Sequence, residues 1–319
     1  MLPEHIMDAI NQMHNKPSSL TVIYEDMALR KQLGTDATWG KVDDPWQPDD
    51  GEYPSDALYG PGSIRDTMKI LVMTPSHPKY GVKPQTLASI QAAIQAYDGI
   101  AEWLISSGDN PYAEPYENVT YHHNKARQWV LDGDYDALLS IEADMIVPPD
   151  TIKQLIDCHS DIAYGLYVWR NKPRRWNVYT DLTLWGGTSV SLNHEGSDAR
   201  EAWGKIMDVA GLGMGCTLIK RDVLQAMRFR IHDGQPDWIA DEYKEDFDKL
   251  GKLMGMTINP YRPHPKMVCD DWLLAMDAQH YGFSQRCNLN VICGHIHHDG
   301  VIWPDPNEKV FYRIEESRR

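Results

Sequence analysis

Two carboxylates follow an apolar run in the middle of the chain. Residues 138–141 (Leu-Leu-Ser-Ile) are typical of a buried strand, and Glu142 and Asp144 come directly after it, ahead of a Pro-Pro-Asp sequence. In an extended segment, side chains at positions i and i+2 point to the same side. Two converging hard oxygen ligands suit Mg²⁺ or Mn²⁺, and either ion can hold a diphosphate. Such acid pairs are common in solvated loops, but the position straight after a strand favours a metal site.

Histidines near the end of the chain offer a further ligand type. His295, His297 and His298 lie within four residues, after an apolar run. A neutral imidazole beside carboxylates suits Mn²⁺ better than Mg²⁺. We expect His295 to be the ligand, with His297, on the same side of an extended segment, as the alternate. A zinc site made of Cys287, Cys293 and His295 is a rival, but its spacing matches no common zinc pattern.

Two other segments carry residues with possible chemical roles. Residues 211–221 are rich in glycine, and Gly213 and Gly215 would let the backbone approach a ligand without a Cβ in the way. A glycine-rich hairpin without a ligand is the ordinary alternative. Asp270 and Asp271 open a predicted helix, where the helix dipole favours a carboxylate in any case. The functional alternative is a general base, and we place Asp271 ahead of Asp270 in that role.

Alternating strands and helices must position these residues. Apolar runs predict strands at 69–74, 100–106, 135–141 and 162–169, and helical patterns lie at 84–97, 123–131 and 150–158. This alternation predicts βαβ units, and so a parallel sheet covered by helices on both faces. In such sheets ligands bind at the carboxyl ends of the strands, where Glu142 and Asp144 are expected to lie.

Taken in order, these segments resemble the GT-A glycosyltransferase fold, in particular the family-2-like nucleotide-sugar transferases. Residues 142–144 resemble that fold's DXD motif, with Glu142 replacing the first Asp. The resemblance implies an α/β fold with a mixed, mostly parallel sheet flanked by helices. It also implies that Asp144 is the direct metal ligand and that Glu142 contacts the ribose or a metal-bound water. His295 matches the position of a further metal ligand in that family.

Further matches to the family imply roles in binding the donor. Asn124-Lys125-Ala126-Arg127 resembles the helix before the DXD strand, where a basic residue approaches the nucleotide, and Arg170 is a second candidate cation. By the same resemblance, Thr74 ends the strand that holds the base and Asp109 follows the second strand. Gly213 and Gly215 would shape the pocket of the donor sugar. Asp271 lies in a segment similar to the acidic motif below the acceptor site.

The resemblance therefore implies a metal-dependent glycosyltransferase that uses Mn²⁺ or Mg²⁺ and a UDP- or GDP-linked sugar. The acceptor is undetermined: a glycan, a small molecule or a modified DNA base would all fit, and so would inversion or retention. A nucleotidyltransferase is one alternative, although residues 75–81 lack its glycine-rich signature loop. A non-catalytic nucleotide- or sugar-binding module is another. Walker A, GxGxxG and Gly-x-Ser-x-Gly motifs do not occur where kinases, dehydrogenases and hydrolases carry them.

The composition limits the partners and the location. The net charge of −15 disfavours extended nucleic-acid binding, since that binding relies on a basic face. A local basic patch at Lys172, Arg174 and Arg175 could still hold a diphosphate. The sequence has no apolar run of about eighteen residues, so we expect no membrane span. Its five scattered cysteines indicate reduced thiols, and we expect a cytoplasmic protein.

Three regions follow from the composition along the chain. Residues 1–66 form an acidic arm, with twelve Asp or Glu against five Lys or Arg. Its aromatic residues predict that it packs on the core or on a neighbouring subunit, so a homo-oligomer is possible. Residues 67–302 form the GT-A domain, and residues 303–319 form a C-terminal tail.

Overall fold

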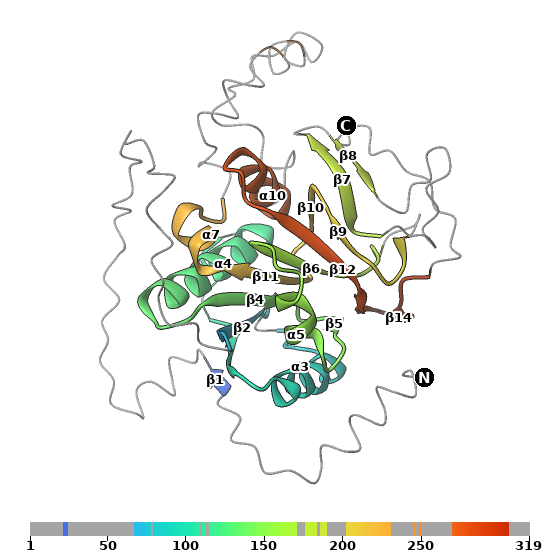
Figure 1. The fold of residues 1–319 in the computed structure, drawn as a ribbon. Coiled ribbons are helices and arrows are strands. Elements are labelled where there is room, and N and C mark those ends of the chain that lie inside the picture. Colours follow the sequence, from blue (N-terminus) through green and yellow to red (C-terminus); the bar gives the residue numbers. More distant parts are fainter. Residues whose placement is uncertain are drawn as a thin grey trace.

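The computed structural model describes residues 22–24, 67–77, 79–108, 110–112, 115–170, 176–183, 186–189, 202–230, 245, 249 and 270–305. Its centre is an eight-stranded sheet in the order β1-β3-β2-β4-β11-β6-β12-β9 (Figure 1). The strands of this sheet are β1 (Val22–Tyr24), β2 (Lys69–Pro75), β3 (Ile100–Ser106), β4 (Ala137–Ile141), β6 (Ile162–Leu166), β9 (Ile206–Asp208), β11 (Cys216–Lys220) and β12 (Gln285–Ile292).

The first half of the sheet is parallel. β2 pairs in parallel with β3 on one side and with β4 on the other. All five residues of β4 are buried, as are all residues of β2 after Lys69. Continuous apolar strands of this kind are expected where both faces of a parallel sheet are covered. Their carboxyl ends meet at one edge, and β4 delivers Glu142 to that edge.

β11 runs antiparallel between β4 and β6, which makes the sheet mixed. Its first residue, Cys216, pairs with Ile141, the last residue of β4. This reversed direction places the glycine-rich turn before β11 beside the acidic turn after β4. The backbone N–H of Glu142 donates to the carbonyl of Gly215 over 3.1 Å, which joins the two turns.

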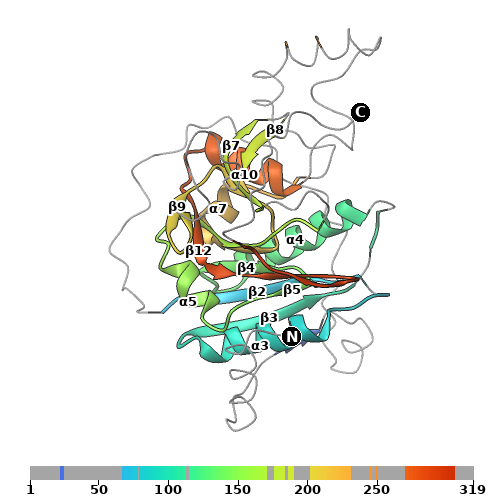
Figure 2. The same cartoon turned by 90° about the vertical axis from the view of Figure 1, so that its right-hand side faces the viewer.

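Helices cover both faces of the sheet (Figure 2). They are α3 (Pro84–Ala96), α4 (Pro115–Asp132), α5 (Thr151–Ile156), α7 (Arg221–Ala226) and α10 (Asp270–His280). α3 and α5 share one apolar cluster with the sheet, through residues such as Ile90 and Leu155. α4, α7 and α10 share a second cluster, through residues such as Val130, Leu224 and Leu274. The sheet therefore lies between two helical layers.

Two small sheets complete the described structure. β10 (Gly211–Leu212), β7 (Val178–Thr183) and β8 (Gly186–Ser189) form one, with α10 packed against it. β14 (Gly300–Ile302), β13 (Gly294–His297) and β5 (Met145–Ile146) form the other. In the second, His295 pairs with Met145, and the N–H of Ile296 donates to the carbonyl of Asp144 over 2.8 Å. This pairing fixes the C-terminal histidines beside the acidic turn.

The predicted fold class, α/β with a mixed, mostly parallel sheet flanked by helices, is confirmed. Most boundaries agree within two residues, and two elements differ by more. The helix predicted at 123–131 already begins at Pro115, a start that is possible since proline is tolerated in the first turn of a helix. The strand predicted at 162–169 ends at Leu166, where the partner strand β12 shifts register and the ladder stops.

The arm at residues 1–66 enters the described structure only as β1. Val22 pairs with Trp103 of β3, so β1 adds a parallel edge strand to the sheet. The rest of the arm, the Lys172–Arg175 patch and the tail after residue 305 lie outside the described residues. The division into an arm, a central domain and a tail therefore stays a prediction.

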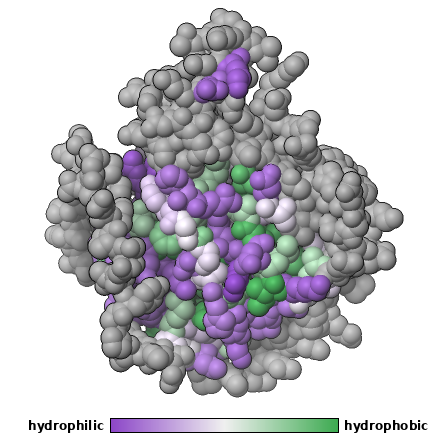
Figure 3. Space-filling view, turned by 45° about the horizontal axis from the view of Figure 1, so that its top comes forward, coloured by the Kyte–Doolittle hydropathy of each residue, from purple (hydrophilic) through white to green (hydrophobic). Residues whose placement is uncertain are grey.

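Exposed apolar side chains on the described surface are scattered. Figure 3 shows hydrophilic residues interspersed with smaller hydrophobic areas on the face that it presents. The large exposed hydrophobic residues are Tyr80, Ile100, Tyr112, Ile206 and Tyr281, which come from different elements. Among the described helices, none combines the length and apolarity that crossing a bilayer requires.

Candidate functional site

A tight turn after β4 presents Glu142 and Asp144. The N–H of Met145 donates to the carbonyl of Glu142 over 3.1 Å, and the chain then enters β5. The segment is thus a turn rather than the extended strand that the i, i+2 argument assumed. The two carboxylates nevertheless converge with His295, because one ligand atom of each of the three residues lies within 4.8 Å of the others. The structure therefore brings together the first three predicted metal ligands.

His295 is buried, and its ring is oriented by the backbone. Its Nδ1 lies 2.8 Å from the carbonyl oxygen of Val168. A carbonyl only accepts hydrogen bonds, so Nδ1 carries the proton and Nε2 carries the lone pair. Nε2 points toward Asp144 Oδ1, 3.7 Å away, and has no hydrogen-bond partner among the described residues. Metal-bound histidines commonly donate their other ring N–H to a backbone carbonyl or a carboxylate, which fixes the tautomer in this way.

The protonation state of His295 fits the same interpretation. Burial lowers the pKa of the imidazole below its usual value, although the carbonyl of Val168 and the charge of Asp144 act in the opposite direction. The ring is therefore neutral at neutral pH, and its approach to Asp144 is not an ion pair. A buried, neutral nitrogen without a partner, facing two carboxylates, is a suitable third ligand for a divalent cation. The residues present thus fit the metal that the sequence implied.

Arg170 places a positive charge beside Asp144. Its Nη1 donates to Asp144 Oδ2 over 2.7 Å, and about half of the arginine side chain is exposed (47%). The other oxygen of Asp144 faces His295. Asp144 therefore has one oxygen directed to a cationic side chain and one directed to the predicted ligand set.

The glycine-rich turn packs against Tyr167. A Cβ at Gly215 would lie 2.8 Å from the Tyr167 ring, and a Cβ at Gly213 would collide with the Tyr167 hydroxyl and with Asn177. Asn177 also donates a short hydrogen bond from Nδ2 to that hydroxyl. The Tyr167 ring also makes an edge contact with His295, at 5.7 Å between centroids. The two glycines are thus required by close packing around the site.

Asp271 belongs to the same neighbourhood. It lies in the first turn of α10, and its Oδ2 would be 2.8 Å from a Cβ at Gly213. Burial raises the pKa of the Tyr167 phenol well above its usual value, and the charges of Glu142 and Asp271 raise it further. Both carboxylates are therefore close enough to act on one phenol. Asp270 opens α10 as predicted, but its side chain lies outside the described residues.

The other predicted site residues are not part of the group formed by Glu142, Asp144 and His295, and two of them make hydrogen bonds elsewhere. Thr74 is fully buried at the end of β2, and its hydroxyl accepts a hydrogen bond from Trp103 over 3.1 Å. Arg127 Nε donates to the carbonyls of Leu224 and Met227, so it ties α4 to α7. It also lies in the C-terminal part of α4, toward the amino end of β4. Asp109 lies outside the described residues.

His297 belongs to a different group of possible metal ligands from the one that the sequence predicted. It gathers with His298 and Asp299 at the turn after β13, whereas Glu142, Asp144 and His295 form the first group. The rival zinc site is not assembled among the described residues, since Cys287 and Cys293 belong to neither group. Burial raises the pKa of both thiols well above the usual value, which disfavours the thiolates that zinc requires.

Sequence reasoning missed the residues that support the ligands. Tyr167 and Val168 follow β6, and Asn177 precedes β7, far from the acidic turn in the sequence. It also missed two buried histidines in α4. His122 lies 2.8 Å from Ser106 Oγ, and His123 lies 3.1 Å from Ser140 Oγ, near the ends of β3 and β4. Because the predicted strand continued to Trp169, Tyr167 and Val168 were expected inside it, and no pattern in the sequence pointed to their place beside the site.

Comparison with known proteins gives only distant likenesses. No protein-family model and no curated protein matches this sequence. A197 from STIV is similar at 16% identity over 79% of this chain and 96% of that chain, with a TM-score of 0.44. A glycosyltransferase involved in the glycosylation of the major capsid of PBCV-1 is similar at 9% identity over 50% and 62% of the two chains, with a TM-score of 0.29. S. aureus TarS 1-349 in complex with UDP-GlcNAc is similar at 12% identity over 69% and 56%, with a TM-score of 0.34. Since these TM-scores are below 0.5, the function has to be inferred from the residues of the site.

Proposed function

We propose that this protein is a metal-dependent glycosyltransferase that moves a sugar from a nucleotide-sugar to an acceptor hydroxyl. The observation that carries the proposal is the convergence of Glu142, Asp144 and His295 at the carboxyl end of β4, with His295 Nε2 buried and lacking a hydrogen-bond partner among the described residues. Two carboxylates and one neutral imidazole form a ligand set for Mn²⁺ or Mg²⁺, with Mn²⁺ favoured by the imidazole.

Glu142, Asp144 and His295 would hold the cation. When bound, a divalent cation neutralises the charge that develops on a departing diphosphate. Arg170 is positioned to add a second positive charge, because it already contacts Asp144 and half of its side chain faces solvent. Its half-exposed guanidinium can therefore turn toward a diphosphate when a cation takes its place on Asp144. The acidic turn thus holds the leaving-group side of the reaction.

Asp271 is the proposed general base. Its carboxylate lies against Gly213, close enough to raise the pKa of Tyr167 together with Glu142. It can accept the proton of an acceptor hydroxyl as that oxygen attacks the anomeric carbon. The absence of a Cβ at Gly213 and Gly215 makes room for the side chains of Tyr167 and Asn177. The role of these glycines as walls of the sugar pocket stays a prediction from the sequence. Thr74, Arg127, Asp109 and Asp270 remain candidates for donor binding and catalysis from sequence alone.

The donor is proposed to be a UDP- or GDP-linked sugar, and the acceptor a glycan, a small molecule or a modified DNA base. The test is to incubate the purified protein with a panel of these sugars and Mn²⁺ or Mg²⁺, and to measure the nucleoside diphosphate released. Metal-dependent release by the wild type, absent with chelator, is expected. A protein that is stabilised by nucleotide-sugars but releases no nucleoside diphosphate with any acceptor would instead be a binding module.

A further inference from the structure

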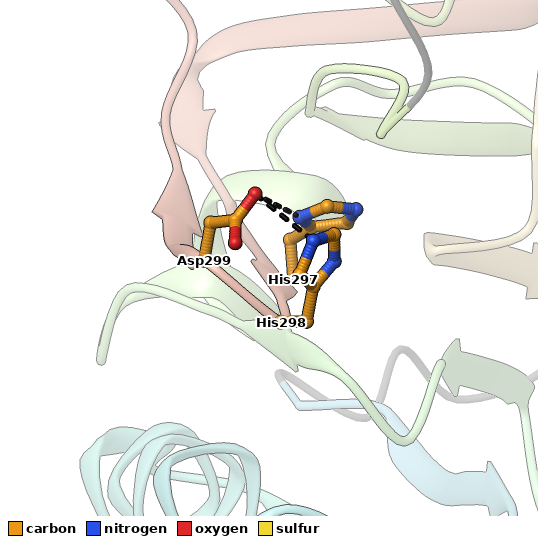
Figure 4. A group of neighbouring side chains, drawn as sticks. All are labelled: His297, His298 and Asp299. Carbon is orange, nitrogen blue, oxygen red and sulfur yellow. Dashed lines mark ion pairs between the residues drawn. The ribbon is translucent and has the colours of Figure 1, made fainter.

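A second group of metal-ligating side chains lies outside the proposed catalytic site. His297, His298 and Asp299 offer one ligand atom each within 4.8 Å of one another. Figure 4 shows both imidazole rings beside the Asp299 carboxylate, with a nitrogen of each ring directed to it. His298 Nε2 lies 3.0 Å from Asp299 Oδ2, and His297 Nδ1 lies 3.7 Å from the same oxygen.

We propose that these three residues form a second metal site, which takes a borderline divalent cation such as Zn²⁺ or Co²⁺. Ligand atoms about 2.1 Å from a tetrahedrally coordinated ion lie about 3.4 Å from one another. The nitrogens of His298 and His297 lie 3.0 Å and 3.7 Å from the Asp299 oxygen, just below and just above this distance. Two imidazoles and one carboxylate are a common ligand set for zinc, and they are a poor one for Mg²⁺, which prefers oxygen ligands.

The turn between β13 and β14 arranges the three residues. His297 pairs with Gly300 across the hairpin, so His298 and Asp299 form a two-residue turn. In a straight strand the side chains of neighbouring residues point to opposite faces. At this turn the chain reverses, and the rings of His297 and His298 come to 3.7 Å between centroids. Gly300 completes the turn with a φ of 133°, which side-chain-bearing residues rarely adopt.

The hairpin is joined to β5 through β13. β13 pairs with β5, and the N–H of Ile296 donates to the carbonyl of Asp144. His298 and Asp299 are about three-quarters exposed (74% and 77%), so water can reach an ion from the open side. The second site thus shares β13 with the first but uses none of the residues Glu142, Asp144 and His295.

Competition between metals can separate the two sites. The full-length protein is first stripped with chelator and then kept in excess Mg²⁺, which competes with Co²⁺ more strongly for the two carboxylates of the first site than for the two imidazoles of the second. Co²⁺ is then titrated, and bound Co²⁺ is measured by equilibrium dialysis and by its visible absorption. We expect His298→Ala and Asp299→Asn each to weaken one Co²⁺ ion by about tenfold or more, a loss typical of a damaged metal shell. His280→Ala removes another exposed histidine and is the matched control.

The same titration on Asp144→Asn decides whether the sites are distinct. A Co²⁺ ion that survives Asp144→Asn and is lost in His298→Ala supports the proposal. Co²⁺ binding by His298→Ala that equals that of the wild type would overturn it. Loss of the same ion in both Asp144→Asn and His298→Ala would also overturn it, because His297 would then belong to the first site. The experiment needs no substrate, so its result is independent of the proposed glycosyl transfer.

Discussion

The two histidine–carboxylate groups both include residues of β13 but are assembled in different ways. The first draws Glu142 and Asp144 from the end of β4 and His295 from β13, some 150 residues later in the chain, and its histidine is buried. The second consists of three consecutive residues at an exposed turn. One depends on the pairing of distant strands, and the other depends on the geometry of a two-residue hairpin.

This difference separates a site suited to chemistry from a site suited to binding. The buried group has a supporting shell: Val168 fixes the His295 tautomer, Tyr167 packs on its ring, and Arg170 contacts Asp144. A low-dielectric, oriented environment strengthens the electrostatic effects on which catalysis depends. In the exposed group, solvent screens the charges and surrounds two of the three side chains. We therefore expect substitutions in the first group to affect turnover and those in the second to affect metal content alone.

The largest effect is expected for Asp144→Ala. Losing a metal ligand removes several kcal/mol of stabilisation from the transition state, and we expect turnover to fall by about 10³-fold or more. Release of nucleoside diphosphate with and without Mn²⁺ measures it. Asp157→Ala, which removes an exposed carboxylate from the turn after α5, is the control and is expected to keep turnover. Full Mn²⁺-stimulated turnover in Asp144→Ala would show that the acidic turn is not the metal site.

The next effect concerns the base and should be separable from the metal. Asp271→Asn keeps the size of the side chain but cannot accept a proton near neutral pH. Turnover should fall by about 10²–10⁴-fold while donor affinity stays nearly constant. Steady-state kinetics together with calorimetric titration of the donor would test this. Equal losses in affinity and turnover would make Asp271 a structural residue of the Gly213 contact instead.

A smaller effect is expected for Gly300→Ala, which strains the turn between β13 and β14. Gly300→Ala meets no atom within 4 Å of the new Cβ, so its cost is that of the backbone conformation, about 1–3 kcal/mol in the free energy of unfolding. Urea denaturation measures this cost, and Co²⁺ titration shows whether the second site weakens with it. Gly282→Ala, at a φ of 76°, is a matched control that should destabilise the protein without changing Co²⁺ binding. Similar losses of Co²⁺ in both variants would mean that the turn does not organise the ligands.

The smallest effect is expected for Arg170→Ala. The guanidinium competes with a cation for Asp144, and a half-exposed ion pair contributes about 0.2–1 kcal/mol. Without donor, Mn²⁺ should bind about 1.4- to fivefold more tightly to this variant. Electron paramagnetic resonance of free Mn²⁺ gives the affinity, with Arg170→Lys as the variant that keeps the charge. Weaker Mn²⁺ binding in Arg170→Ala would instead show that the arginine holds Asp144 in a binding geometry.

Much of the fold follows from the sequence. The apolar run at 69–74 becomes β2, which is buried after Lys69, since strands buried on both faces need continuous apolar residues. The run at 100–106 becomes β3, whose last four residues are buried. Local pattern is less informative where the tertiary structure sets the limits. β6 ends at Leu166 because of a register shift in β12, and the apolar residues that continue to Trp169 give no sign of it. The pairing of β1 with β3 likewise depends on a contact some 80 residues away.

The sequence by itself determined which residue types could bind a cation and that Glu142 and Asp144 follow a buried strand. Only the tertiary structure decided which histidine joins them. His295 and His297 are equivalent in an extended segment, but the pairing of His295 with Met145 turns its ring toward Asp144. The hairpin turn carries His297 away to His298 and Asp299. The physical reason is that side-chain direction follows the period of a strand only until the chain turns, and strand pairing sets where that happens.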